Sequence, residues 1–188
     1  MAIAIPEKIR AAVACLLEEF RTIAPQVKWI KPDNLHITLK FLGKTDAVKL
    51  SLIGQSLAKV KMAQPIVLTF GVPAVMIHGK GPSVVWMEIK SSPSLNTLVA
   101  ELENRMVKLG FPKENRPFVP HLTLARVPRS APPWTVAPFP AKLIETIRDS
   151  STELGSFSTG EFHLMESKLK SSGAEYASVH SFSFLAEA

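Results

Sequence analysis

Apolar residues recur every three or four positions in two long segments, which predicts two amphipathic helices. The first covers residues 6–23, with Pro6 in its first turn, and the second covers 93–109, with Gly110 at its end. Their apolar positions are Ile9, Val13, Leu16, Leu17 and Phe20 in the first, and Leu95, Leu98, Val99, Leu102, Met106 and Leu109 in the second. Shorter helices are expected at 46–62 and 140–149, the former with Val48, Leu52, Leu57 and Val60 near one face.

Runs of apolar and β-branched residues predict the strands between these helices. The expected strands cover residues 2–5, 27–30, 35–42, 66–71, 74–78, 83–90, 120–127, 157–166 and 174–184. Several of them follow one another without a helix in between, which favours an α+β fold with antiparallel or mixed sheets over a parallel, doubly wound sheet. The segment VPRSAPPWTVAPFP at 127–140 is too rich in proline for regular structure, so we expect a loop there.

Two of the expected strands carry the same short pattern, His-x-Thr-Leu. It occurs in HITLKFLG at 36–43 and again in PHLTLAR at 120–126. Because side chains alternate along a strand, His36, Thr38 and Lys40 share one face, and His121 and Thr123 share one face of the other strand. The apolar residues between them form the opposite faces, which must pack in the core. The doubled pattern hints at two similar halves, although the rest of the halves do not align.

An imidazole and a hydroxyl on each of two strands suit acid–base chemistry on a phosphodiester. The pKa of histidine is about 6.5, so near neutral pH one ring can accept a proton while the other donates one. A threonine hydroxyl can donate to a negatively charged oxygen. One histidine would activate water for in-line attack on phosphorus, and the other would protonate the leaving oxygen.

Other kinds of site are less well supported by the sequence. A single histidine on a strand is usually structural, and we interpret His78, in an expected turn, and His163 and His180, on late strands, as surface or structural residues. A zinc site needs three or four ligands, and neither motif strand holds a cysteine or a carboxylate. There is no nucleophile elbow of the Gly-x-Ser-x-Gly type and no glycine-rich phosphate loop. Among the aromatic residues, Trp29 and Trp86 are expected in the core, whereas Tyr176 and Trp134 could stack on a base.

Composition says more about the size and cellular compartment of the protein than about its function. The chain has 188 residues, enough for one domain or two small lobes, and its net charge of +6 is a moderate excess that suits an anionic partner but equally a solvated surface. Its one cysteine, Cys15, forms no internal disulfide, so we expect a reducing cytoplasm and a place for Cys15 in the core. No apolar run reaches the ~20 residues of a membrane span, and the N-terminus does not look like a signal peptide.

HITLKFLG and PHLTLAR together resemble the paired signature of the two-histidine phosphoesterase superfamily, in its LigT-like branch. These proteins are RNA 2′,3′-cyclic phosphodiesterases, historically called 2′-5′ RNA ligases. The helix opening at Pro6, Glu7, Ile9 and Arg10 and the closing segment FHLMESKLKSSGAEYASV are similar to the family as well. The resemblance implies one domain, residues 1–188, with two pseudo-symmetric lobes of antiparallel or mixed sheet, outer helices and a central basic cleft.

The resemblance also implies an activity. It is the hydrolysis of a terminal 2′,3′-cyclic phosphate on RNA to a 2′-phosphomonoester, with no metal and no cofactor, and with 2′-5′ ligation as a possible reverse activity. His36 would be the acid and His121 the base, although which does which stays open, and Thr38, Thr123 and Arg126 would bind the substrate. We expect a cytoplasmic monomer whose partners are RNA ends or nucleotides that carry a cyclic phosphate.

Three points stay open at this stage. Arg126 has the opposite strand parity from His121 and Thr123, so either a bulge re-aims it or it approaches from the end of the strand. The substrate could instead be a small cyclic phosphate, such as a nucleotide or an ADP-ribose derivative. A non-catalytic RNA-binding relative of the same fold is the third reading.

Overall fold

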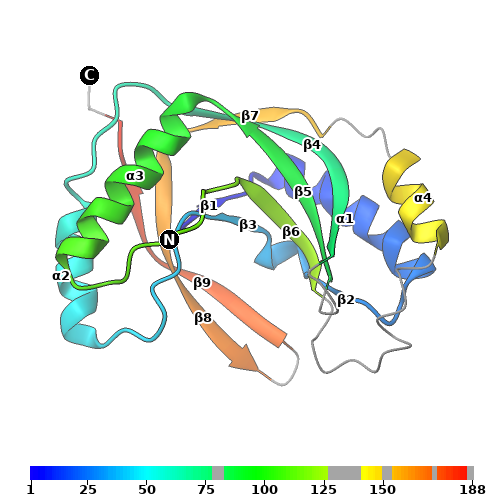
Figure 1. Ribbon diagram of the computed structural model, residues 1–188, viewed down its shortest axis with the longest axis horizontal. Helices are drawn as coiled ribbons and strands as arrows, with labels where there is room; N and C mark the ends of the chain where they lie inside the picture. Colours follow the sequence, from blue (N-terminus) through cyan, green and yellow to red (C-terminus); the bar gives the residue numbers. More distant parts are fainter. Residues whose placement is uncertain (78–82, 127–140, 150–153, 171–172, 186–188) are drawn as a thin grey trace.

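The structure, a computed structural model, describes residues 1–77, 83–126, 141–149, 154–170 and 173–185. Its helices are α1 (Glu7–Ile23), α2 (Ala47–Leu57), α3 (Pro93–Lys108), α4 (Ala141–Asp149) and a short 3-10 helix, η1 (Pro32–Asn34). Its strands are β1 (Ala2–Ala4), β2 (Lys28–Trp29), β3 (His36–Thr38), β4 (Ile66–Ile77), β5 (Ser83–Ser91), β6 (His121–Arg126), β7 (Ser156–Thr159), β8 (Glu161–Lys170) and β9 (Gly173–Ser183). Figure 1 shows how these elements are arranged.

The strands form one curled sheet in the order β7-β4-β5-β6-β3-β1-β8-β9, with β2 pairing beside β3 along β6. Every pair between these named strands is antiparallel, so the predicted α+β class with an antiparallel sheet is confirmed. The two motif strands, β3 and β6, are neighbours at the centre of this order. Strands that are distant in the chain therefore meet where the two halves of the sheet join.

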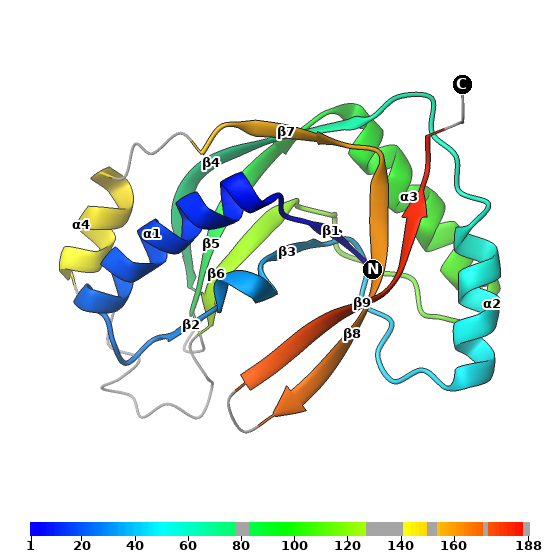
Figure 2. The same cartoon turned by 180° about the vertical axis from the view of Figure 1, so that it is seen from behind.

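Each half of the sheet has four strands, β3-β1-β8-β9 on one side and β6-β5-β4-β7 on the other. In each half a strand and a helix precede the motif strand: β1 and α1 precede β3, with β2 and η1 in between, and β5 and α3 precede β6. Helix α1 packs against α4 and α2 packs against α3, and the two helix pairs lie at opposite ends of the molecule (Figures 1 and 2). This repetition is what a fold with two pseudo-symmetric lobes requires.

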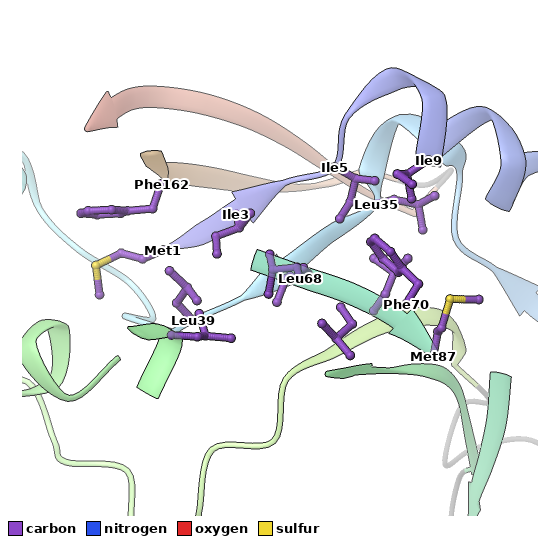
Figure 3. Packing of buried hydrophobic residues seen from close by; sticks show 14 of the residues in the cluster. Met1, Ile3, Ile5, Ile9, Leu35, Leu39, Leu68, Phe70, Met87 and Phe162 are labelled. Atoms are coloured by element: carbon purple, nitrogen blue, oxygen red, sulfur yellow. The ribbon is translucent and has the colours of Figure 1, made fainter. Parts of the chain in front are cut away.

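The core lies behind the motif face of the sheet. Ile37, Leu122 and Leu124, which alternate with the histidines and threonines, have no exposed surface. Figure 3 shows Ile3 of β1, Ile5 just after this strand and Ile9 of α1 in the same cluster as Phe70 of β4. Each such side chain contributes roughly 1.5–3 kcal/mol on burial, so the apolar face holds the motif strands in register.

The two long helices form as their apolar stripes predict. The buried residues of α1 and α3 lie where the sequence pattern predicts them, from Ile9 to Phe20 and from Leu95 to Met106. Leu109, the last expected position, lies just after α3 and is only half buried. Gly110 follows α3 with φ +84, a left-handed conformation that glycine adopts without steric cost, so the predicted end is correct as well. The helix expected at 140–149 is confirmed as α4.

The helix expected at 46–62 is wrong in its extent and in part of its buried face. Helix α2 ends at Leu57, and its buried residues are Ile53 and Leu57. Val48 is 74% exposed and Leu52 is 46% exposed, whereas Leu57 and Val60 are buried as expected. Its apolar residues are spread around the helix, so the pattern did not define a single stripe.

Strand boundaries differ from the prediction where the chain bends. The strand expected at 35–42 is only the three residues of β3, because η1 precedes it and the chain leaves the sheet after Thr38. The two strands expected at 66–71 and 74–78 form one strand, β4, with a register shift between Phe70 and Pro73. The strand expected at 157–166 divides at Gly160 into β7 and β8. A side chain at Gly160 would lie 2.5 Å from Leu185 Cδ1.

Cys15 corrects one further prediction, because it is exposed on α1 and not in the core. None of the helices that the structure describes has the length and apolar character that a bilayer crossing requires. His78, Trp134 and the proline-rich segment 127–140 lie outside the described residues.

Candidate active site

The pairing of β3 with β6 brings the two motifs together. Ile37 lies opposite Leu122 in an antiparallel register. One residue further in each direction, His36 lies opposite Thr123 and Thr38 opposite His121, all on the face away from the core. The histidines are therefore diagonal neighbours on one face, about 7–8 Å apart at the backbone. Each imidazole has the hydroxyl of the other motif beside it.

Both imidazoles are held by the same hydrogen bond. His36 Nδ1 lies 2.8 Å from the Asn34 carbonyl oxygen, and His121 Nδ1 lies 2.9 Å from the Val119 carbonyl oxygen. A carbonyl oxygen only accepts, so Nδ1 of each ring carries the hydrogen. Nε2 is then the nitrogen left to exchange a proton with a substrate. The two histidines are thus equivalent in geometry, each bonded to the residue two positions before it.

The surroundings of His36 bear on its protonation state. Burial lowers the pKa of His36 below its usual value of 6.5, and the hydrogen bond to Asn34 opposes this shift. The positive charges of the chain N-terminus and of Arg126 lower the pKa further. His36 is therefore neutral at pH 7 in the free protein.

A β-bulge explains how Arg126 reaches this face. In the pairing of β5 with β6, Trp86 lies opposite Thr123, but Val84 lies opposite Arg126, with a register shift between them. Residues 84 and 86 of β5 point to the same side, so Thr123 and Arg126 do as well. The two positions of β6 between Thr123 and Arg126 are both buried, as this shift requires. Of the two explanations that the sequence left open, the bulge is correct.

Each histidine also contacts an aromatic ring that the sequence did not assign to it. The Tyr176 ring lies 4.5 Å from the His36 ring, centroid to centroid, and the Trp86 ring lies 5.4 Å from the His121 ring with its edge toward it. Trp86 was expected in the core, yet it is only half buried and lies on the motif face. Trp29 packs against the core as predicted and donates from Nε1 to the Ala24 carbonyl oxygen at 2.9 Å.

Asn34 connects His36 to the β8–β9 hairpin. Its amide nitrogen donates to the Ala174 carbonyl oxygen at 2.7 Å, and its amide oxygen accepts from the Tyr176 backbone N–H at 3.3 Å. Its backbone carbonyl accepts from His36 Nδ1. One residue therefore fixes both the ring of His36 and the strand that supplies Tyr176. Sequence reasoning missed Asn34. The available signal was an amide residue two positions before the motif histidine.

Residues 6–170 match the sequence profile of the 2′-5′ RNA ligase superfamily. An RNA 2′,3′-cyclic phosphodiesterase of Archaeoglobus fulgidus is 31% identical over 183 residues, which is 97% of each chain. The chain belongs to the 2′-5′ RNA ligase superfamily. This confirms the resemblance that the two motifs predict.

Solved structures of other proteins have the same fold as this superfamily member. A crystal structure from Thermus thermophilus matches with a TM-score of 0.75 at 23% identity, over 97% of this chain and 95% of that one. Escherichia coli LigT in complex with 3′-AMP matches with a TM-score of 0.72 at 24% identity, over 97% of this chain and 95% of that one. At these identities the likeness shows the fold.

Lys40, which the sequence placed on the face of His36, does not contribute to the site, because its side chain is held in a buried ion pair. Its Nζ donates to Glu103 Oε1 at 2.7 Å and to the Pro112 carbonyl oxygen at 2.9 Å. The two side chains of this ion pair are only 6% and 14% exposed. The pair joins the segment after β3 to α3 and to the loop that leads toward β6. It therefore connects the segments next to the two motif strands.

The other described histidines have local partners, as expected of structural residues. His163 Nδ1 lies 3.2 Å from Ser178 Oγ, with Glu161 on its other side, and the His180 ring packs on Phe182. Within the described ranges, no three histidine, cysteine or acidic side chains gather as they would around a metal ion. The absence of a metal from the reaction remains a prediction.

Proposed function

We propose that this chain hydrolyses the 2′,3′-cyclic phosphate at the end of an RNA strand to a 2′-phosphomonoester, with His36 and His121 as the acid–base pair. The observation that carries the proposal is the register of β3 and β6, which gathers both imidazoles and both threonines on one face. Relatives such as the Archaeoglobus fulgidus protein, named for this activity, support the choice of substrate.

In the proposed reaction a water molecule attacks phosphorus opposite the ribose O3′. The base takes one proton from the water as the new P–O bond forms, and the P–O3′ bond breaks. The acid gives its proton to O3′, which leaves as a hydroxyl while the phosphate stays on O2′. Each positioned proton transfer contributes typically 10²–10⁴-fold in rate. If a 5′-hydroxyl attacks in place of water, the same steps form a 2′-5′ linkage.

The two threonine hydroxyls would bind the cyclic phosphate, and Arg126 would bind the substrate beside it. Thr38 and Thr123 stand beside the two rings, where their O–H groups can donate to the non-bridging oxygens. The guanidinium of Arg126 adds a positive charge on the same face. Donors fixed before the reaction stabilise the charge that develops in the transition state at little reorganisation cost, so the proposal requires no metal.

Following the resemblance of the two motifs to this superfamily, we assign the acid role to His36 and the base role to His121. Burial keeps His36 neutral at pH 7 in the free protein, because its pKa is lowered. The negative charge of a bound cyclic phosphate favours the imidazolium, so the ring gains its proton when the substrate arrives. The assignment is tested with a phosphodiester whose leaving group is nitrophenolate, which needs no acid. The variant that lacks the acid should recover most of its activity on this substrate, whereas the variant that lacks the base should not.

The test of the function itself is product analysis on an oligoribonucleotide that ends in a 2′,3′-cyclic phosphate, with a metal chelator present. We expect a 2′-phosphate as the product, and we expect His36→Ala and His121→Ala each to lose at least about 10²-fold in kcat. Both variants should keep the far-UV circular dichroism of the unmodified protein. Binding of the oligonucleotide without turnover would favour the non-catalytic reading, and turnover of only small cyclic phosphates would favour the alternative substrate.

A further inference from the structure

A second cation stands beside Arg126. Strand β2 pairs with the far end of β6, where Lys28 lies opposite Arg126 and Trp29 opposite Ala125. Residues directly opposite in an antiparallel pair project to the same side, with their Cβ atoms about 4.5–5.5 Å apart. Both Lys28 and Arg126 are exposed. The face that carries the histidines therefore continues into a pair of positive side chains.

This pair is separate from the cyclic phosphate position but adjacent to it. The bulge in β6 turns Arg126 to the side of Thr123, and the corresponding residues of β5, Val84 and Trp86, are two positions apart. Two positions along a strand span about 7 Å. Lys28 lies beyond Arg126, across the neighbouring strand. A group bound between Lys28 and Arg126 would thus lie next to a phosphate held between the two imidazoles, on the same face of the sheet.

Lys28 and Arg126 differ from the other arginines whose side chains the structure describes, because those arginines have acidic partners. Arg10, Arg21, Arg105 and Arg116 each pair with a nearby glutamate. Neither Lys28 nor Arg126 forms a salt bridge within the part of the chain that the structure describes. Like charges directly opposite each other destabilise a sheet, and no acid offsets them here. Such an arrangement gains its stabilisation from a bound anion.

We propose that Lys28 and Arg126 bind the internucleotide phosphate on the 5′ side of the terminal nucleotide. The inference rests on the proposed function and names its substrate class as oligoribonucleotides, because a cyclic mononucleotide has no such phosphate. The lysine supplies a mobile point charge and the arginine a planar set of donors, so together they follow a backbone without reading its sequence. The site makes the enzyme selective for chain ends over small cyclic phosphates.

The experiment compares kcat/KM for a short oligoribonucleotide that ends in a 2′,3′-cyclic phosphate with kcat/KM for a 2′,3′-cyclic mononucleotide. We expect Lys28→Ala to lower the ratio of the two values about tenfold, and Lys28→Arg to restore it. The salt dependence of oligonucleotide binding should weaken by about 0.7 in log–log slope, the value for one phosphate contact on a single strand. The matched control is Lys108→Ala, at the exposed end of α3 and well apart from β2 in Figures 1 and 2, which should leave the ratio unchanged.

A substrate with a neutral methylphosphonate at the internucleotide position isolates the contact. The unmodified protein should no longer prefer this oligonucleotide over the cyclic mononucleotide. Lys28→Ala should not lower kcat/KM for it any further. The proposal is overturned if Lys28→Ala lowers kcat/KM equally for both substrates or changes it for neither. It is also overturned if Lys28→Ala still lowers kcat/KM for the oligonucleotide with the neutral linkage. If the unmodified protein turns over neither substrate, the proposed function fails instead. In that case the salt dependence of oligonucleotide binding, compared between the unmodified protein and Lys28→Ala, still tests whether Lys28 contacts a phosphate.

Discussion

Replacing Asn34 with alanine tests how the site is held in place. The substitution removes the hydrogen bond to the Ala174 carbonyl oxygen and the one from the Tyr176 N–H, but it keeps the backbone carbonyl that accepts from His36. Each hydrogen bond contributes about 0.5–1.5 kcal/mol net, so we expect the free energy of unfolding to fall by about 1–3 kcal/mol. Far-UV circular dichroism during urea unfolding measures this loss.

The effect on activity should exceed what this loss of stability explains. Without Asn34, the hairpin that carries Tyr176 is no longer tied to the turn before His36, and the ring contact of 4.5 Å loosens. A displacement of about 1 Å in a catalytic group costs up to 10²-fold, so we expect kcat to fall about 10- to 100-fold at a temperature where the variant is fully folded. KM should change much less.

A readout at His36 itself separates positioning from general destabilisation. Burial lowers the pKa of His36, so a loosened hairpin should let water reach the ring and raise that pKa toward 6.5. An NMR titration of the imidazole measures it. Tyr176→Phe is the matched control, because it keeps both the ring and the backbone N–H. If Asn34→Ala loses stability but keeps kcat and the pKa of His36, the positioning role is wrong.

Two further predictions concern stability. Lys40→Ala leaves the Glu103 carboxylate buried without its partner and should cost about 3–5 kcal/mol in urea unfolding, whereas the double change Lys40→Met, Glu103→Leu should recover most of this loss. An equal loss in both variants would contradict the ion-pair argument. Because the pKa of His36 is lowered in the folded protein, the unfolded chain binds more protons than the folded one just below pH 6.5. The contribution of His36 to the free energy of unfolding is therefore complete above pH 6.5 and declines as the pH falls below it. His36→Gln should flatten the decline, and an unchanged pH dependence would count against the burial of the ring.

Local pattern was enough to predict the long helices and the two motifs. The stripes of α1 and α3 are strong because each buries one face, whereas α2 has exposed apolar residues such as Val48 and therefore no reliable face. The alternation in each motif strand placed its histidine and threonine on one side. These features depend on neighbours along the chain, which the sequence displays directly.

What the sequence did not contain was the pairing between distant segments. The register that sets His36 opposite Thr123 depends on β3 and β6 meeting, and the position of Arg126 depends on a bulge against β5. The contact of Tyr176 with His36 requires the hairpin to fold back onto η1. None of these has a signature in a window of neighbouring residues, because each is decided by packing across the sheet.

The most direct measurement of the central claim compares His36→Ala, His121→Ala and the double variant on one cyclic-phosphate oligonucleotide. If the two rings serve the same phosphate, either single change should remove most of the activity, and the double variant should be little worse than the singles. A single variant with the activity of the unmodified protein, or losses that multiply in the double variant, would show that the rings do not act as one unit.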